Sequence, residues 1–182
     1  FAGGPLSGDK NYWKFSGQAS HFMPLPYNAV LEFRGRIGLA DSFGSSNSLP
    51  IYERFFTGGA YSLRGYEERK VGPIDSISKD PLGGNSMLVG NIEYTYPLFA
   101  FLKVAAFYDV GNVWEKLGNI GSSKNANGVL NSGGFKSDFG LGLRIKTPVG
   151  PIMQDYGFPL NKASGEERKK SGRFNFSASH GF

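Results

Sequence analysis

Seven segments of this chain alternate between apolar and polar residues, each over about ten residues. They lie at residues 12–23, 28–40, 85–96, 102–114, 137–148, 151–160 and 173–182. The polar positions carry charges in the middle of several segments, for example Glu93, Asp109 and Arg144. A soluble β-sandwich also alternates, but charges at mid-strand on neighbouring strands are typical of a transmembrane barrel with a polar interior. The pattern therefore predicts an all-β fold, a transmembrane antiparallel β-barrel.

The composition is compatible with a membrane barrel although it resembles that of a soluble protein. The mean hydropathy is −0.28, and 40% of the residues are hydrophobic. A transmembrane strand shows lipid only at every second residue, so its average hydropathy stays low. The longest apolar-looking stretch, residues 96–108, is interrupted by Lys103, and no run approaches the ~20 residues of a spanning helix.

The connections between the segments form two sets that alternate along the chain. Residues 24–27, 97–101 and 147–150 are short and contain proline, whereas residues 41–84, 115–136 and 161–172 are long and polar. Short periplasmic turns and long exterior loops are the pattern of outer-membrane barrels. Bacterial barrels have an even number of strands, and an open sheet edge leaves backbone groups unpaired in lipid. We therefore expect residues 1–182 to be the C-terminal part of one larger barrel.

The loop at residues 41–84 contains the segment YERFFTGGAYSLRGYEERKVGP, which is too patterned for a spacer. Gly58, Gly59 and Gly65 permit tight backbone turns around Arg64. A loop of this length without regular structure is usually functional. The planar fork of an arginine suits two carboxylates at once, and Glu93 and Asp109 are the nearest inward-facing acids in sequence. The alternative is a solvated arginine in a surface loop, and the composition of the loop leaves both interpretations open.

Enzymatic, metal-binding and nucleic-acid-binding functions find little support in the sequence. The chain has no Cys, which excludes disulfides and thiolate metal sites, and His21 and His180 lie on different strands. No catalytic triad spacing or phosphate-binding loop is present, so we predict neither an enzyme nor a cofactor or metal. The net charge is +5, but the Lys and Arg are spread along the chain, so we expect no nucleic-acid partner.

Several motifs, taken in order, resemble the BamA superfamily of outer-membrane assembly barrels. They are YERFFTGGAYSLRGY, GGNSMLVGNIEYTYPL, AAFYDVGNVW, GLGLRIKTPVGPIMQDYGFPLN and RFNFSASHGF. The resemblance covers essentially the whole chain. It implies a barrel of about sixteen strands preceded by POTRA domains, of which this chain contains about seven to eight strands and no POTRA domain. It also implies that Arg64, followed by Gly65 and Tyr66, reaches from the loop into the lumen and contacts Glu93 and Asp109.

The last strand is a second candidate site. Phe174, Phe176 and Phe182 share one register, and a terminal aromatic residue in this pattern resembles the signal by which barrel proteins are recognised for assembly. An ordinary interfacial aromatic anchor would have the same pattern. The resemblance implies a lateral seam at this strand that inserts nascent β-barrel proteins into the outer membrane of a Gram-negative bacterium, with lipid and accessory lipoproteins as further partners. The alternatives are a two-partner secretion or TamA-like translocator of the same superfamily and a passive porin.

Overall fold

The computed structural model describes residues 10–44, 48–117, 129–130, 133–148, 150–162 and 171–178. Within these ranges one antiparallel sheet has seven strands in the order β1-β2-β4-β5-β7-β8-β9. The strands are β1 (Tyr12–Pro24), β2 (Val30–Ser42), β4 (Ser86–Phe99), β5 (Leu102–Trp114), β7 (Lys136–Thr147), β8 (Gly150–Pro159) and β9 (Arg173–Ala178). Each strand pairs with the next along the chain, so the predicted all-β antiparallel fold is confirmed. Residues 179–182 of the last predicted strand, including Phe182, lie outside the described residues.

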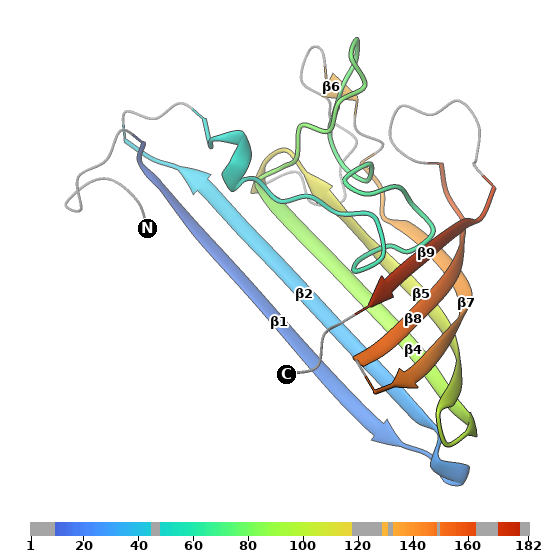
Figure 1. The fold of residues 1–182 in the computed structure, drawn as a ribbon. Helices are drawn as coiled ribbons and strands as arrows, with labels where there is room; N and C mark the ends of the chain where they lie inside the picture. Colours follow the sequence, from blue (N-terminus) through green and yellow to red (C-terminus); the bar gives the residue numbers. More distant parts are fainter. Residues whose placement is uncertain are drawn as a thin grey trace.

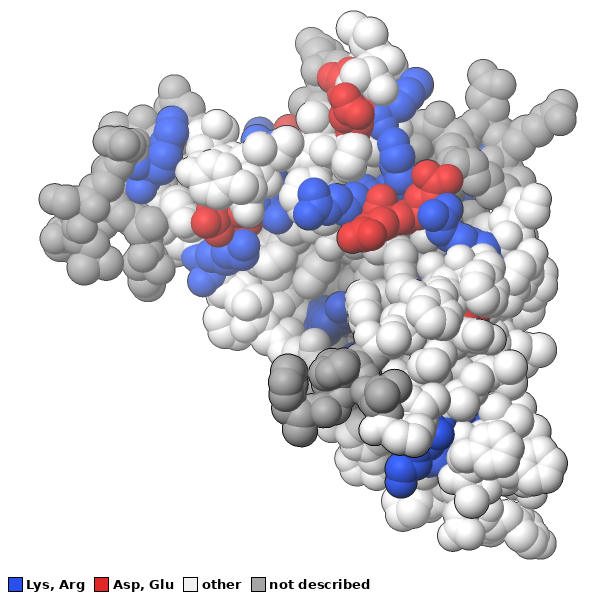
Figure 2. Space-filling model, in the orientation of Figure 1, with Lys and Arg blue, Asp and Glu red and all other residues white. Residues whose placement is uncertain are grey.

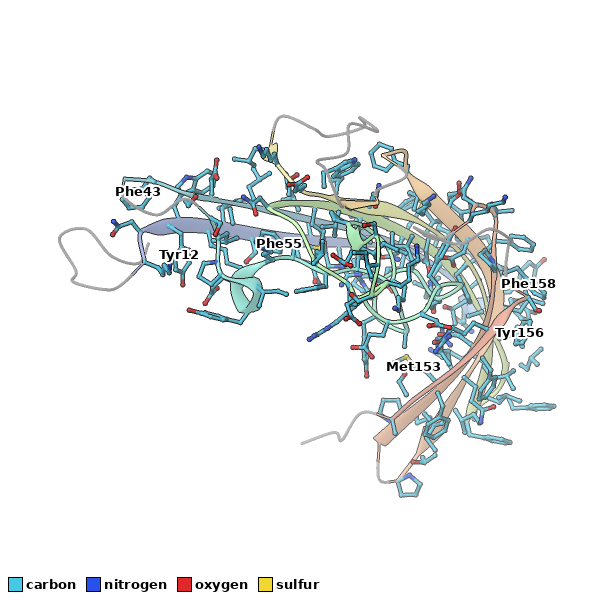
Figure 3. All side chains as sticks on the ribbon, turned by 90° about the horizontal axis from the view of Figure 1, so that it is seen from above. Tyr12, Phe43, Phe55, Met153, Tyr156 and Phe158 are labelled. Atoms are coloured by element: carbon cyan, nitrogen blue, oxygen red, sulfur yellow. The ribbon has the colours of Figure 1, made fainter. Side chains whose placement is uncertain are left out.

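The sheet is a curved wall rather than a flat layer (Figure 1). Seen from above, it bends through a hook, and the long connection between β2 and β4 lies within the concave side (Figure 3). Phe55 and Met153 point into this concavity, whereas Tyr156 and Phe158 point outward from the convex face (Figure 3). The curvature is that of one part of a barrel wall, with the concave side as its lumen.

The convex face is apolar, and no described segment of the chain covers it. Because side chains alternate across a strand, one register on every strand faces outward. Large apolar side chains exposed there include Phe15, Phe33, Ile37, Leu88, Ile92, Tyr108, Phe139, Leu141, Tyr156, Phe158, Phe174 and Phe176. In the view of Figure 2, most charged side chains lie near the long-loop end and the surface below them is largely uncharged. An uncovered apolar surface that spans a whole sheet is suited to lipid.

The concave face is partly covered by the β2–β4 connection, which has its own small core (Figure 3). Leu63, Tyr66 and Val71 from the loop pack with Val89 of β4 in one buried cluster. A second cluster joins loop residues Leu49 and Phe55 to the wall residues Ala40 and Val113. The loop is therefore bound to the inner wall by apolar contacts at two places, before any charge is considered.

Four short elements interrupt the connections, and the alternation pattern predicts none of them. They are the 3-10 turns η2 (Pro26–Asn28) and η3 (Ile51–Glu53) and the strands β3 (Ile74–Asp75) and β6 (Val129–Leu130), which pair with each other. Segments of two or three residues are too short to express a period. No helix among the described residues is long and apolar enough to cross a membrane.

Candidate functional site

The backbone around the loop glycines forms a tight turn that presents Arg64 to the wall. Gly58 has φ of 110° and Gly59 has φ of 92°, a region that residues with a Cβ rarely adopt. The Gly59 N–H donates to the carbonyl oxygens of both Leu63 and Tyr66, each at 3.1 Å. The Ser62 hydroxyl accepts a hydrogen bond from the Gly58 N–H at 2.8 Å. The glycine pair therefore closes the turn whose far side carries the arginine.

Arg64 makes its most extensive contact with Asp109 of β5. Its Nε and Nη2 donate to the two Asp109 oxygens at 2.8 and 2.9 Å, and its own backbone N–H donates to Oδ2 at 3.2 Å. Arg64 is 7% exposed and Asp109 is fully buried. Asn91 of β4 donates to Asp109 Oδ1 at 2.8 Å and also to the Ser62 carbonyl. Four hydrogen-bond donors therefore compensate the charge of the Asp109 carboxylate, which is buried away from water.

The remaining side of the guanidinium faces Glu93 and an aromatic ring. Arg64 Nη1 lies 2.5 Å from Glu93 Oε2, and the guanidinium carbon lies 3.6 Å from the centre of the Phe107 ring. Burial alone would lower the pKa of Arg64, but the hydrogen bonds and charges of Asp109 and Glu93 outweigh burial and raise this pKa above its ordinary value. Arg64 is therefore a cation in this site. The structure brings Arg64, Glu93 and Asp109 together as the sequence predicts.

Gly65 serves a purpose other than the predicted one. The φ angle of Gly65 is not positive, so its backbone conformation does not require a glycine. A Cβ on Gly65 would lie 2.6 Å from the Cβ of Asp138 on β7, and a Cβ on Gly157 of β8 would lie 2.7 Å from the Gly65 nitrogen. Glycines on both sides of the contact let the loop backbone approach the wall directly. Gly65 therefore lies directly against Asp138 of β7 and Gly157 of β8, and this contact is called the seat of the loop below.

Tyr66 ties the loop to the long-loop end of the wall. Its ring is 3% exposed. Its hydroxyl lies 3.0 Å from the Ser137 carbonyl oxygen and 2.9 Å from that of Asn161, and it accepts from the Asn161 N–H at 3.2 Å. The aromatic ring thus contributes apolar burial while the hydroxyl binds the ends of β7 and β8.

Side chains that were not predicted as site residues also contact Arg64 or its acidic partners, namely Asn91, Phe107, Arg144, Asp155 and Asn175. Arg144 of β7 binds Glu93 and Asp155, and Arg64 Nη1 lies 3.6 Å from Asp155 Oδ2. Asn175 of β9 donates to the Arg64 carbonyl at 2.7 Å. Alternation places Arg144, Asp155 and Asn91 on the inner face, which is the only signal the sequence offers. Their meeting depends on the register between strands, and one sequence without structure does not give that register.

The predicted residues of the last strand lie apart from the arginine site. β9 pairs with β8 from Gly157↔Arg173 to Ile152↔Ala178, at one edge of the sheet. Phe174 and Phe176 are 60% and 58% exposed on the convex face. They occupy the lipid-facing register, while Asn175 between them reaches the loop.

The whole chain, residues 1–182, matches the model of the Omp85 superfamily domain. It is 35% identical over 179 residues to the outer membrane protein assembly factor BamA of Nitratidesulfovibrio vulgaris, covering 97% of this chain and 21% of that protein. It is 29% identical to BamA of Neisseria meningitidis, covering 89% of this chain and 23% of that protein.

A solved structure has the same fold. The crystal structure of BamA from Haemophilus ducreyi lacking POTRA domains 1–3 matches with a TM-score of 0.76 at 24% identity, over 94% of this chain and 35% of that one. The chain therefore spans about a fifth of the length of the curated relatives it matches. The predicted resemblance is confirmed over the whole sequence, and the chain belongs to the Omp85 superfamily.

Proposed function

We propose that the protein containing this chain resides in a bacterial outer membrane and folds and inserts other β-barrel proteins there. The observation that carries this proposal is the 35% identity, over 97% of this chain, to a protein named as an outer membrane protein assembly factor. The inner site adds support, because the resemblance to the superfamily implies a loop arginine that reaches into the lumen, and Arg64 contacts Asp109 and Glu93 there. The partners would be lipid and nascent β-barrel proteins.

Arg64 is proposed to tether the loop and brace the wall. Loop residues 58–66 contact β4 through Glu93, β5 through Asp109 and β9 through Asn175. One arginine and its backbone thus link three strands that are not all neighbours in the sheet. A brace of this kind keeps the wall curved while a strand at its edge pairs with something else.

The edge strand β9 is proposed as the seam. Its outer side faces no other strand in the described sheet. An unpaired edge presents backbone N–H and C=O groups that template an incoming strand by β-augmentation. Insertion by this route makes and breaks hydrogen bonds only, so it needs neither a catalytic residue nor a cofactor. The exposed Phe174 and Phe176 would keep the seam strand in lipid during exchange.

The accessory lipoproteins, the POTRA domains and the remaining strands are proposed from family membership alone. In this proposal residues 1–182 are the C-terminal part of a larger barrel, with the short turns in the periplasm and the long loops outside. The lipoproteins would meet the protein on its periplasmic side.

Depletion of the full-length protein in its own cell tests the proposal. The abundance of all outer-membrane barrels is then measured by quantitative mass spectrometry. A fall across many unrelated barrels is expected. Loss of one secreted protein with the other barrels intact would assign a dedicated translocator of the same superfamily instead, and no change in either would reject both functions.

A further inference from the structure

Arg144 contacts the same carboxylates as the loop arginine, but from the wall. It lies on the inner face of β7. Its Nε and Nη2 donate to the two oxygens of Glu93 at 3.0 and 2.9 Å, and its Nη1 donates to Asp155 Oδ1 at 2.6 Å. Glu93 is on β4 and Asp155 is on β8. Arg144 therefore joins two strands on either side of its own through its guanidinium.

The two arginines and two carboxylates form a closed ring. Arg64 Nη1 lies 2.5 Å from Glu93 Oε2 and 3.6 Å from Asp155 Oδ2, and Arg144 binds both acids from below the loop. The four side chains are between 8% and 16% exposed. Charges with so little access to water need partners, and here each acid has two.

Residues of the wall alone provide the space for this ring of ion pairs. Gly142 of β7 is the register partner of Asp155. A Cβ at Gly142 would overlap Asp155 Oδ1 and lie 2.7 Å from Arg144 Nη1. Because glycine has no side chain, the Arg144–Asp155 ion pair occupies the space beside Gly142. The pair Arg144–Asp155 is thus built into adjacent wall strands and requires no atom of the loop.

We propose that Arg144 is a positioning residue that holds the Glu93 and Asp155 carboxylates in the places where Arg64 meets them. Arg144 binds both oxygens of Glu93 and one oxygen of Asp155, and Arg64 Nη1 approaches the same two acids from the loop. Without Arg144 the two acids can turn away from Arg64, so the loop is held less firmly. The inference rests on the proposed tethering role of Arg64 and not on what the barrel assembles.

Loop release can be measured with a thiol placed on the wall beneath the loop. Val89 of β4 is 1% exposed and packs against Leu63, Tyr66 and Val71. The chain contains no cysteine, so Val89→Cys introduces a single reporter within it. The full-length protein, with this as its only thiol, is assayed in native membranes for the rate of maleimide labelling. The rate reports the fraction of time that the loop is lifted from β4.

Arg144→Met is expected to raise the labelling rate about tenfold, the order expected for lost hydrogen bonds to a charged group. Glu93→Gln should raise the rate as well. The two changes together should raise it little more than the larger one alone, because both remove the same contact. Arg144→Lys should give a labelling rate between those of the unchanged protein and Arg144→Met, since an ammonium does not bridge two carboxylates as a planar guanidinium does.

Arg34 is the matched control, because it binds Glu32 through Nε and Nη2 at 3.0 and 2.6 Å on the inner face of β2. Arg34→Met should change the rate by less than about twofold. The proposal is overturned if Arg144→Met has no effect, if its effect multiplies with that of Glu93→Gln as for independent sites, or if Arg34→Met loosens the loop equally. Should Arg144→Met fail to insert, Asp155→Asn tests the same ring under the same criteria. Labelling does not depend on assembly activity, so this inference and the proposed function can fail separately.

Discussion

At the scale of single residues, the loop is bound by one buried arginine, and its removal should release the loop. Arg64→Ala leaves Asp109 and Glu93 without their loop donors, and breaking one partner of a buried ion pair costs about 3–5 kcal/mol. We expect faster tryptic cleavage within residues 58–73 and reduced barrel assembly by the full-length protein. Arg64→Lys should give a smaller change in the same direction. Unchanged cleavage and unchanged assembly would falsify the tether.

The seat of the loop can be tested with two glycines that differ only in their surroundings. A Cβ at Gly157 would press on the backbone of Arg64 and Gly65, whereas a Cβ at Gly35 would meet nothing within 4 Å. Gly157→Ala should destabilise the folded barrel by about 1–3 kcal/mol, as overpacking does. Gly35→Ala should be neutral or slightly stabilising, because glycine weakens a strand. Urea unfolding in lipid vesicles measures both, and equal midpoints would remove the steric role of the seat.

The sequence points to the centre of this site but not to its surroundings. Alternation places Glu93 and Asp109 inward and the glycines single out Arg64, but the composition of the loop leaves a solvated arginine open. The resemblance to the superfamily is what implies the contact among the three. The participation of Arg144 and Asp155 was not predictable, because Arg144 of β7 meets Glu93 and Asp155 of β8 meets Arg64 only through sheet curvature and register. The purpose of Gly65 was also missed, since a close approach to Asp138 leaves no mark in a sequence.

At the scale of elements, the strands follow the alternation closely while the loops do not. The segment expected at 102–114 is β5 (Leu102–Trp114), and that at 151–160 is β8 (Gly150–Pro159). Each such strand is long enough for its two faces to differ in polarity, so the pattern determines both its extent and its orientation. The pair β3–β6 joins Ile74 to Leu130 and Asp75 to Val129, in two loops far apart in sequence, and depends on contacts that no local pattern encodes.

Neighbouring positions of β9 should differ in how strongly the same new side chain destabilises the protein. Phe176 is 58% exposed on the convex face, whereas Ser177 lines the inner cavity together with Arg144. Phe176→Asn places an amide in lipid and should cost roughly 1–3 kcal/mol, while Ser177→Asn should stay within about 0.5 kcal/mol. The folded fraction of each variant in vesicles across a urea titration gives both values. A larger loss for Ser177→Asn would mean that the assigned faces of β9 are wrong.

At the scale of the whole molecule, the β2–β4 loop connects strands from different parts of the curved wall. Its contacts reach β4 at Glu93, β5 at Asp109, β8 at Asp155 and β9 at Asn175. Apolar clusters near the long-loop end and the ion-pair ring deeper in the concavity hold it at separate heights. A sheet held this way can keep its shape while one edge exchanges partners, which is the property that insertion through a seam requires.

Among the described residues the sheet has two open edges, β1 and β9, and this limits what residues 1–182 can do alone. β1 has 13 residues, and its outer side faces no strand in the described part of the chain. Each unpaired backbone group in lipid costs several kcal/mol. We therefore expect that residues 1–182 by themselves do not form a heat-resistant monomer in detergent or vesicles.

Supplying the remaining barrel strands of the parent protein as a separate chain should produce a heat-resistant complex, because those strands pair with both β1 and β9. Mobility on unheated and heated denaturing gels, together with the circular dichroism melting curve, distinguishes the two states. A monomer of residues 1–182 that melts cooperatively in vesicles would mean that these strands close on themselves. The seam would then lie between β9 and β1 of this chain, and the larger barrel proposed here would be wrong.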